Sequence, residues 1–218
     1  RRQKLVRWFW CACLSQHYES SANQKAERDY QALLAWLDGD DAPAYVTNYQ
    51  ATIDFENITP RQRALYSTLM CLLLANGARD FHTGELITSA LIRSKNIDDH
   101  HIFPLIHLGE TDRRKPNPKY DNILNRTLID AKTNRTISGT APPEYLAVID
   151  AEQGRSQVDT TLASHGIREE GITALRTDDF DGFKVSRRKY FLERIAAVTG
   201  TSLVHAQNWS PTDLENAD

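Results

Sequence analysis

Residues 98–104 read DDHHIFP and residues 125–135 read NRTLIDAKTNR, and these two stretches decide the expected fold. The pair Ile102–Phe103 and the run 126–129 are short and β-like, and a loop rich in Pro, Asn and charged residues separates them. Asp130 then takes the N-cap position of a short helix. Strand, loop, strand and helix together predict a ββα unit.

Helical patterns flank this unit on both sides. Residues 5–14 are apolar around the whole circumference of a helix, which suits a buried one. Ser, Thr or Pro marks the start of most later helices, and glycine marks several ends. The expected helices run over residues 5–14, from Ser20 or Ser21 to Gly39, from Thr59-Pro60 to Gly77, from Asp130 to Gly139, from Pro142-Pro143 toward Ile149, and over about 183–198.

The expected fold class is mainly α (α+β), with a helical domain surrounding the ββα core. The 218 residues are 40% hydrophobic and 25% charged, which allows a real core in one or two compact units. Three segments are predicted: an N-terminal helical subdomain at 1–80, the ββα core at 81–141 and a C-terminal helical segment at 142–218.

The sequence favours a cytoplasmic location and no membrane partner. No apolar run approaches the roughly 20 residues that a spanning helix needs, and the start at residues 1–4 lacks the apolar stretch of a secretory signal. Because the sequence begins without Met, we expect it to be a piece of a larger protein. Cys11, Cys13 and Cys71 lie in apolar stretches, and their odd number favours buried, reduced thiols over disulfides.

The charge is distributed unevenly. A formal net charge of −3 is unfavourable for a nucleic-acid enzyme, since Lys and Arg drive phosphate binding. Basic runs are often only a solvated face, but their position around the ββα unit favours phosphate contacts. The predicted DNA-binding residues are Arg113, Arg114, Lys115, Arg126, Lys132 and Arg135, and a second basic cluster comprises Lys184, Arg187, Arg188, Lys189 and Arg194.

His100 and His101 are the candidate catalytic pair. Neighbouring side chains of a regular strand point to opposite faces, but at a strand end or bulge one imidazole can bind a metal while the other faces the substrate phosphorus. Asn134, on the following helix, can reach the same ion. So sparse a ligand set leaves positions open for water and phosphate oxygens, as a catalytic site requires.

The two stretches resemble the HNH endonuclease motif, and more closely the HNH domain that ends the modification-dependent restriction and phage-defence proteins of the GmrSD type. The motifs RWFW at 7–10 and PPEYL at 142–146 extend this resemblance to most of residues 5–198. The fold that it implies is a ββα-metal HNH core within a helical domain.

The resemblance also implies a role for each motif residue. It places His100 and Asn134 as metal ligands, His101 as the general base, and Asn125 as the central Asn that ties down the loop carrying His101. Two acidic residues precede the pair, and whether Asp98 or Asp99 joins the metal or orients an imidazole stays open, with Asp99 the candidate for a supporting contact.

The implied function is a metal-dependent HNH DNA endonuclease that nicks one strand, with His101 taking a proton from the attacking water. One imidazole among oxygen ligands suits Mg²⁺ or Mn²⁺, with Ni²⁺ or Zn²⁺ as alternatives. The expected partners are DNA and an N-terminal nucleotide-hydrolysing sensor domain with a DGQQR-like motif, which is absent from this sequence. A homodimer of the full-length protein is a further expectation.

Similar proteins act on DNA with glucosylated cytosines or sense backbone phosphorothioate. The alternative function is a catalytically degenerate DNA-binding or scaffold module of a defence complex. His107 suits packing or a phosphate contact better than catalysis.

Overall fold

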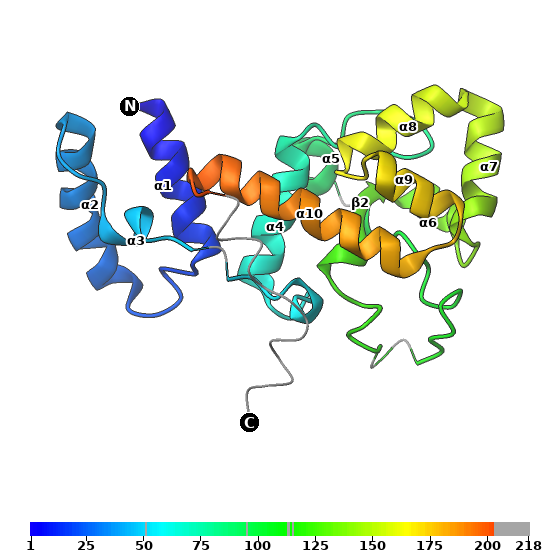
Figure 1. Ribbon diagram of the computed structural model, residues 1–218, viewed down its shortest axis with the longest axis horizontal. Helices are drawn as coiled ribbons and strands as arrows, with labels where there is room; N and C mark the ends of the chain where they lie inside the picture. The colour runs from blue at the N-terminus through cyan, green and yellow to red at the C-terminus, as the bar shows by residue number, and fades with distance from the viewer. Residues whose placement is uncertain (51, 95, 113, 115, 203–218) are drawn as a thin grey trace. The chain divides into compact units, whose positions relative to one another are not determined.

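The computed structural model describes residues 1–50, 52–94, 96–112, 114 and 116–202. These residues form two compact units, whose course Figure 1 traces by colour. The smaller unit comprises Arg1–Ile53 and the described chain from Leu192 onward, and the larger comprises Asp54–Phe191. Both stretches that decide the fold lie in the larger unit.

The smaller unit is helical, with α1 (Arg2–Leu14), α2 (Ala22–Asp38), α3 (Ala44–Thr47) and the end of α10 (Phe180–Thr199). Helix α1 buries Trp10 and Cys11, but Leu5 and Phe9 remain 39% and 49% exposed. The expectation of a helix buried on every side is therefore wrong, because the packing of α1, including its contact with α3, covers one face only.

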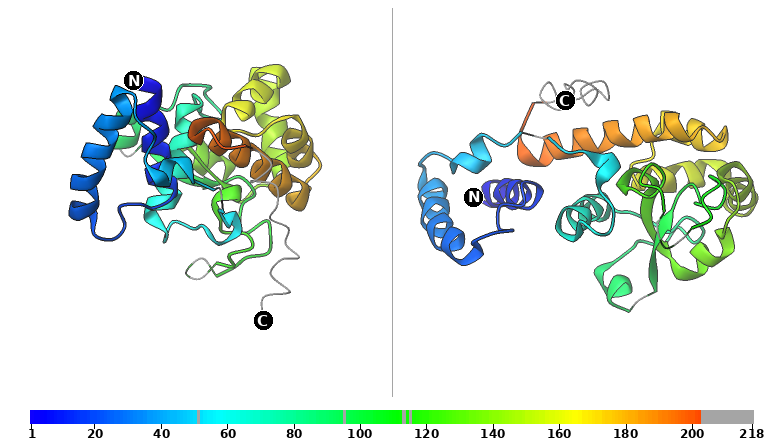
Figure 2. Two further views of the ribbon diagram at one scale, coloured as in Figure 1. Left: turned by 60° about the vertical axis from the view of Figure 1, so that its left-hand side comes forward. Right: turned by 90° about the horizontal axis from the view of Figure 1, so that it is seen from below.

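The larger unit is built on a two-stranded antiparallel sheet with helices around it (Figures 1 and 2). Strand β1 (Ile97–His101) pairs with β2 (Arg126–Asp130), and the register sets His101 opposite Arg126. Helix α6 (Ala131–Ile137) follows β2 directly and contacts both strands. The described chain is thus mainly helical with a small sheet, which confirms the α+β class.

Further helices complete this unit and bury one hydrophobic cluster. Phe103 and Ile129 from the ββα region pack in this cluster with Leu146, Leu162 and Leu175 from three later helices. The elements are η1 (Phe55–Asn57), α4 (Arg63–Ala75), α5 (Ser89–Arg93), η2 (Ile123–Asn125), α7 (Pro142–Gln153), α8 (Arg155–Ser164), α9 (Glu169–Arg176) and the first part of α10.

The two units differ from the three segments expected at 1–80, 81–141 and 142–218. Helix α4 contacts β2, and the helices α7 to α9 share the hydrophobic cluster with the sheet. The ββα region and the helices α7 to α9 therefore share one hydrophobic core.

The first strand lies earlier than expected. Ile102 and Phe103 were expected to form it, but β1 ends at His101, and both apolar residues are fully buried just after the strand. The strand is polar because pairing with β2 defines it, and its side chains find polar partners on both faces. An apolar pattern could not reveal such a strand.

Two helix boundaries also differ. Helix α4 begins at Arg63 rather than at Thr59-Pro60, because Thr59 closes a turn instead, with its N–H and hydroxyl both bonded to Gln62 Oε1. Helix α6 ends at Ile137, and the residue after it, Ser138, has φ 51°, so the reversal precedes Gly139.

Two smaller expectations concern the cysteines and membrane-spanning helices. Cys71 is exposed, not buried, since it lies on the outer face of α4, whereas Cys11 is buried. Within the described residues, no helix is both long and apolar enough to cross a membrane.

Candidate active site

One open cavity of about 410 Å³ in the larger unit collects most of the predicted site. Its lining includes His100, His101 and Asn134. Because His101 ends β1, both imidazoles reach this space although they lie on opposite faces of the strand. The rest of the lining comprises Thr59, Pro60, Arg61, Asp99, Pro104, Leu105, Ile106, Arg114, Pro116, Asp121, Arg126 and Ser138.

The first cluster at the cavity contains His100, Asn134 and Asp98. His100 is only 3% exposed, and its Nδ1 lies 2.7 Å from Oδ1 of Asn134, one turn into α6. The amide Nδ2 of Asn134 donates to Asp98 Oδ2 at 3.0 Å. Helix α6 thus brings its only asparagine to the buried face of β1.

Burial decides the charge of His100. It lowers the pKa of His100 to about 4, so the imidazole is neutral near pH 7. Its Nε2 is buried without a hydrogen-bond partner among the described residues. A neutral imidazole is the form that binds metal ions.

The donors available for a metal are few. Within the described ranges, no group of three or more His, Cys, Asp or Glu side chains is arranged to hold an ion. His100 Nδ1 and Asn134 Oδ1 lie 2.7 Å apart, so an ion held by both atoms would replace the hydrogen bond that joins them. Such a pair fits an ion that keeps several waters, as Mg²⁺ does, and does not fit a closed structural zinc site.

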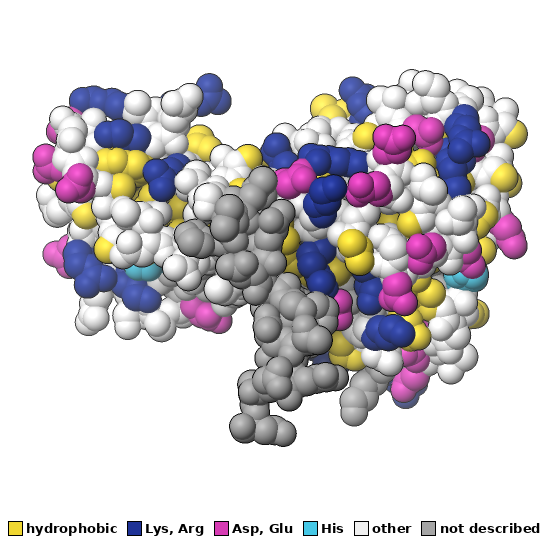
Figure 3. All heavy atoms as spheres, in the orientation of Figure 1, with side chains coloured by type: hydrophobic (Ala, Val, Ile, Leu, Met, Phe, Trp, Pro, Cys, Tyr) yellow, Lys and Arg dark blue, Asp and Glu magenta, His cyan; other side chains and the backbone are white. Residues whose placement is uncertain are grey.

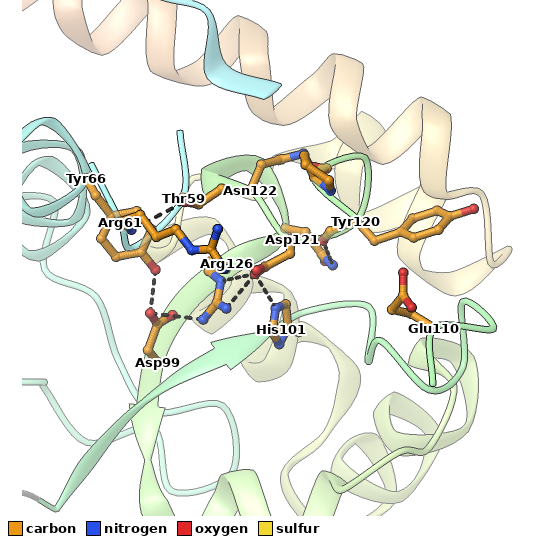
Figure 4. A network of polar contacts seen from close by, with 12 residues as sticks. Thr59, Arg61, Tyr66, Asp99, His101, Glu110, Tyr120, Asp121, Asn122 and Arg126 are labelled. Atoms are coloured by element: carbon orange, nitrogen blue, oxygen red, sulfur yellow. Dashed lines mark hydrogen bonds and ion pairs between the residues drawn. The ribbon is translucent and has the colours of Figure 1, made fainter. Parts of the chain in front are cut away.

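The second cluster surrounds His101 (Figure 4). His101 Nε2 lies 2.9 Å from Asp121 Oδ1, and the same oxygen accepts from Arg126 Nε at 2.9 Å and Nη2 at 2.5 Å. Arg126 Nη1 also lies 3.0 Å from Asp99 Oδ2, which accepts from the Tyr66 hydroxyl at 2.5 Å. A line of hydrogen bonds and ion pairs therefore runs from Tyr66 on α4 through Asp99, Arg126 and Asp121 to His101.

These contacts shift two pKa values. Burial disfavours the charge on Asp121, but hydrogen bonds from His101 and Arg126 outweigh it and lower the pKa of Asp121 to about 2. Burial also disfavours the charge on Arg126, but Asp99 and other neighbours outweigh it and raise its pKa. Both groups are charged at neutral pH.

Asn125 is fully buried and joins the end of the loop to the segment after β1. Its Oδ1 accepts from Phe103 N–H at 2.8 Å, and its Nδ2 donates to the carbonyls of Phe103 and Tyr120 at 2.9 Å each. Because Phe103 is two residues from His101, these bonds fix the backbone next to His101. Asn125 does not line the cavity.

The predicted DNA-binding residues are placed in different surroundings. Arg126 is held between Asp99 and Asp121, with a side chain only 12% exposed. Arg114 is exposed and lines the cavity, whereas Lys132 and Arg135 are exposed on α6 outside its lining. Arg113 and Lys115 lie outside the described residues.

Sequence reasoning missed three side chains near the histidines. Asp121 and Tyr66 belong to the network around His101, and Arg61 lines the cavity from the turn before α4. For Asp121, the only signal in the sequence was that it is a charged residue in the polar loop. Tyr66 and Arg61 lie in a segment that was expected to be one helix, and its apolar pattern indicated packing alone.

Comparison with known proteins finds a relative but assigns no activity. No family model matches the sequence, and no solved structure matches it. An uncharacterized protein of Methanocaldococcus jannaschii is 27% identical over a region that covers 88% of this chain and 36% of that protein. The chain thus spans about a third of the length of this curated relative, and it is similar to a part of an archaeal protein whose own activity is not assigned.

Proposed function

We propose that this chain is a metal-dependent DNA endonuclease domain with an HNH-type ββα-metal site, which hydrolyses one phosphodiester bond at a time. One observation carries the proposal: His100, His101 and Asn134 converge on a single open cavity from the end of β1 and from α6. The resemblance gives these three positions distinct roles in one reaction. The bonds of Asn125 to the segment after β1 support the same assignment.

The metal would be held by His100 and Asn134, with Asp98 bonded to the Asn134 amide. Mg²⁺ or Mn²⁺ suits this donor set best, with Ni²⁺ or Zn²⁺ as alternatives. When bound, such an ion stabilises negative charge on the phosphoryl and leaving oxygens.

The chain's own groups bind the substrate and move the proton. His101 takes a proton from water as the water oxygen attacks phosphorus. Arg61 and Arg114 border the cavity, and no acidic side chain among the described residues forms an ion pair with either. Each can therefore contact a substrate phosphate, a contact that positions DNA without reading its sequence.

The wider role proposed is that of the nuclease part of a modification-dependent phage-defence protein. In this role a nucleotide-hydrolysing sensor outside the sequence would decide when DNA is cut, and the full-length protein would act as a homodimer in cells. The alternative is a DNA-binding or scaffold module without catalysis. The assay below separates the two.

The test is nicking of supercoiled plasmid with Mg²⁺ or Mn²⁺. His101→Ala is expected to slow nicking at least about a hundredfold, because removing a general base costs about that much or more. It should leave Mn²⁺ binding intact in calorimetry, whereas His100→Ala and Asn134→Ala should weaken it.

The matched control is His107→Ala. His107 bonds to Asp178 at 2.8 Å and does not line the cavity, so its loss should leave the nicking rate unchanged. Nicking by His101→Ala at the wild-type rate would show that His101 is not the base. DNA binding without any metal-dependent cleavage by the wild-type chain would favour the scaffold alternative.

A further inference from the structure

The contact between His101 and Asp121 bears on the position of the imidazole and also on which ring nitrogen carries the hydrogen. A neutral imidazole carries its hydrogen on one nitrogen and a lone pair on the other, and only the nitrogen with the lone pair can accept a proton. Which nitrogen is free therefore decides which atom acts as the base. The partner of Nε2 settles this choice, because Nε2 faces Asp121 Oδ1 at 2.9 Å.

Asp121 can only accept hydrogen bonds. It is 9% exposed and ionised at neutral pH, and its Oδ1 already receives two donors from Arg126. An ionised carboxylate has no hydrogen to donate. The ring nitrogen that faces it must then carry the hydrogen.

Arg126 keeps the carboxylate in place. It lies directly opposite His101 in the sheet register, so its guanidinium and the imidazole leave neighbouring strands side by side. Asp99 holds the far side of that guanidinium at 3.0 Å, and the Tyr66 hydroxyl in turn holds Asp99 (Figure 4). These hydrogen bonds and ion pairs hold the Asp121 oxygen against the ring.

We propose that Asp121, positioned by Arg126, fixes His101 in the tautomer that carries hydrogen on Nε2, and so makes Nδ1 the atom that accepts the proton from water. This inference rests on the proposed nuclease function. In the reaction, the water proton passes to Nδ1 while the water oxygen bonds to phosphorus, the bond to the 3′ oxygen breaks, and that oxygen takes a proton from solvent. The Asp121 carboxylate then stabilises the imidazolium that has formed.

The first test uses the resting protein without DNA. Nitrogen-15 shifts of the His101 ring, assigned by their loss in His101→Gln, are measured at about pH 8, above the ordinary histidine pKa of about 6.5. We expect hydrogen on Nε2, with a proton signal protected from exchange by Asp121. Hydrogen on Nδ1 in the wild-type chain would overturn the proposal, whether or not the protein cuts DNA.

The second test compares two variants of Asp121 in nicking. Asp121→Ala should lower kcat about ten- to a hundredfold with little change in KM, less than the loss of the base itself, and the protected Nε2 proton should disappear. Asp121→Asn should keep that proton, and its kcat should lie between those of Asp121→Ala and wild type. Asp121 Oδ1 alone accepts from both His101 and Arg126, and the amide oxygen of asparagine can take its place. Wild-type kcat in Asp121→Ala would refute the positioning role.

The control is Asp178→Asn. It changes a second Asp–His pair of the same kind, Asp178 with His107, which lies outside the cavity lining. Its nicking rate and the His101 ring signals should match wild type. If Asp121→Ala fails to fold, as a thermal melt would show, Asp121→Asn still tests the proposal through its kcat and its Nε2 proton.

Discussion

At the residue scale, His100 and His101 are neighbours in the chain but lie in different surroundings. His100 is buried on the face that meets α6 and is held neutral, while His101 lies at the strand end beside an ionised carboxylate. One surrounding suits a ligand, which must be a neutral imidazole, and the other suits a base that becomes a cation. The alternation of a single β-strand is enough to give the two imidazoles these separate environments.

Arg61 carries a prediction at the same scale. Because it borders the cavity without an ion pair among the described residues, Arg61→Ala should raise KM for DNA and leave kcat nearly unchanged. Losing one phosphate contact should also reduce the slope of log affinity against log salt by about 1. The measurement is plasmid nicking and DNA binding across a salt series.

Lys132→Ala is the control for Arg61. Lys132 is exposed on α6 but does not line the cavity, so its removal should change KM less. Equal effects of the two substitutions would show that the phosphate contact is not specific to the cavity. A fall in kcat alone would place Arg61 in the chemical step instead.

The side chains of the site could be predicted from sequence only where a short motif carries them. His100, His101 and Asn134 lie in two brief stretches, so their order and spacing pointed to one centre. The places of Asp121 and Arg61 and the ion pairs of Arg126 depend on contacts between different segments of the chain. Arg126, for example, was expected to contact phosphate, and in the structure it forms ion pairs with Asp99 and Asp121. Such pairing partners cannot be identified from sequence before the fold is known.

At the element scale, Asp80 anchors the helix that carries Asn134. Its Oδ1 accepts from the N–H groups of His82 and Thr83 and from the Thr133 hydroxyl, and its Oδ2 accepts from Asp130 N–H at 2.7 Å. The last two partners lie at the start of α6. One buried carboxylate, 2% exposed, thus fastens α6 to the segment before α5.

Asp80→Asn should therefore destabilise the fold. An amide has one acceptor oxygen and one NH₂ group, so a buried N–H or hydroxyl would face another donor, at a cost of about 1–3 kcal/mol in the free energy of unfolding. Urea denaturation near pH 7 measures this loss. Asp112→Asn, at an exposed turn, is the control and should change stability by less than about 0.5 kcal/mol.

The pH dependence of this loss has a definite direction. Burial disfavours the charge on Asp80, but its hydrogen bonds outweigh burial and lower its pKa below the ordinary 3.8. The stability from the charged form is present above that ordinary value and is lost as pH falls toward the folded-state pKa. The gap between wild type and Asp80→Asn should hold from pH 7 to about 5 and shrink below about 4. A gap that widened in acid would contradict this assignment.

Some helices and strands have local sequence signals that mark where they begin, and others do not. The start of α6 could be predicted because Asp130 caps it from its own side chain, and the start of α7 because two prolines lead it. β1 could not be placed, since a polar strand exists only through its pairing with β2. Local chemistry marks helix ends, whereas the position of a short strand depends on its partner.

At the scale of the whole molecule, most residues of the second basic cluster form hydrogen bonds or ion pairs within the protein. Arg187 is fully buried and donates to the carbonyls of Leu124 and Arg126, on either side of Asn125. Lys184 and Arg188 pair with Glu56. Figure 3 shows acidic and basic side chains interspersed on the visible face of the larger unit, rather than a broad basic surface. The proposed DNA binding would then draw on fewer cations than the composition suggests.

This smaller number sets the expected salt response of the isolated chain. Arg61 and Arg114 border the cavity, and Lys132 and Arg135 are exposed on the neighbouring α6, so about two to four phosphates can be contacted by described residues. Each contact displaces counterions, which predicts a slope of log affinity against log salt of about −2 to −4. Phosphate contacts carry no sequence information, so unmodified plasmid should be nicked with little sequence preference.

The measurement compares nicking and binding of unmodified, phosphorothioate-containing and glucosylated plasmids from low to physiological salt. We expect similar rates on all three at each salt concentration, because the described lining of the cavity offers cations that contact phosphates, which all three plasmids share. A strict requirement for one modification would place the sensing function within these residues. A flat salt response would show that the cations around the cavity do not bind DNA, and the proposed contact of Arg61 with a substrate phosphate would then be wrong.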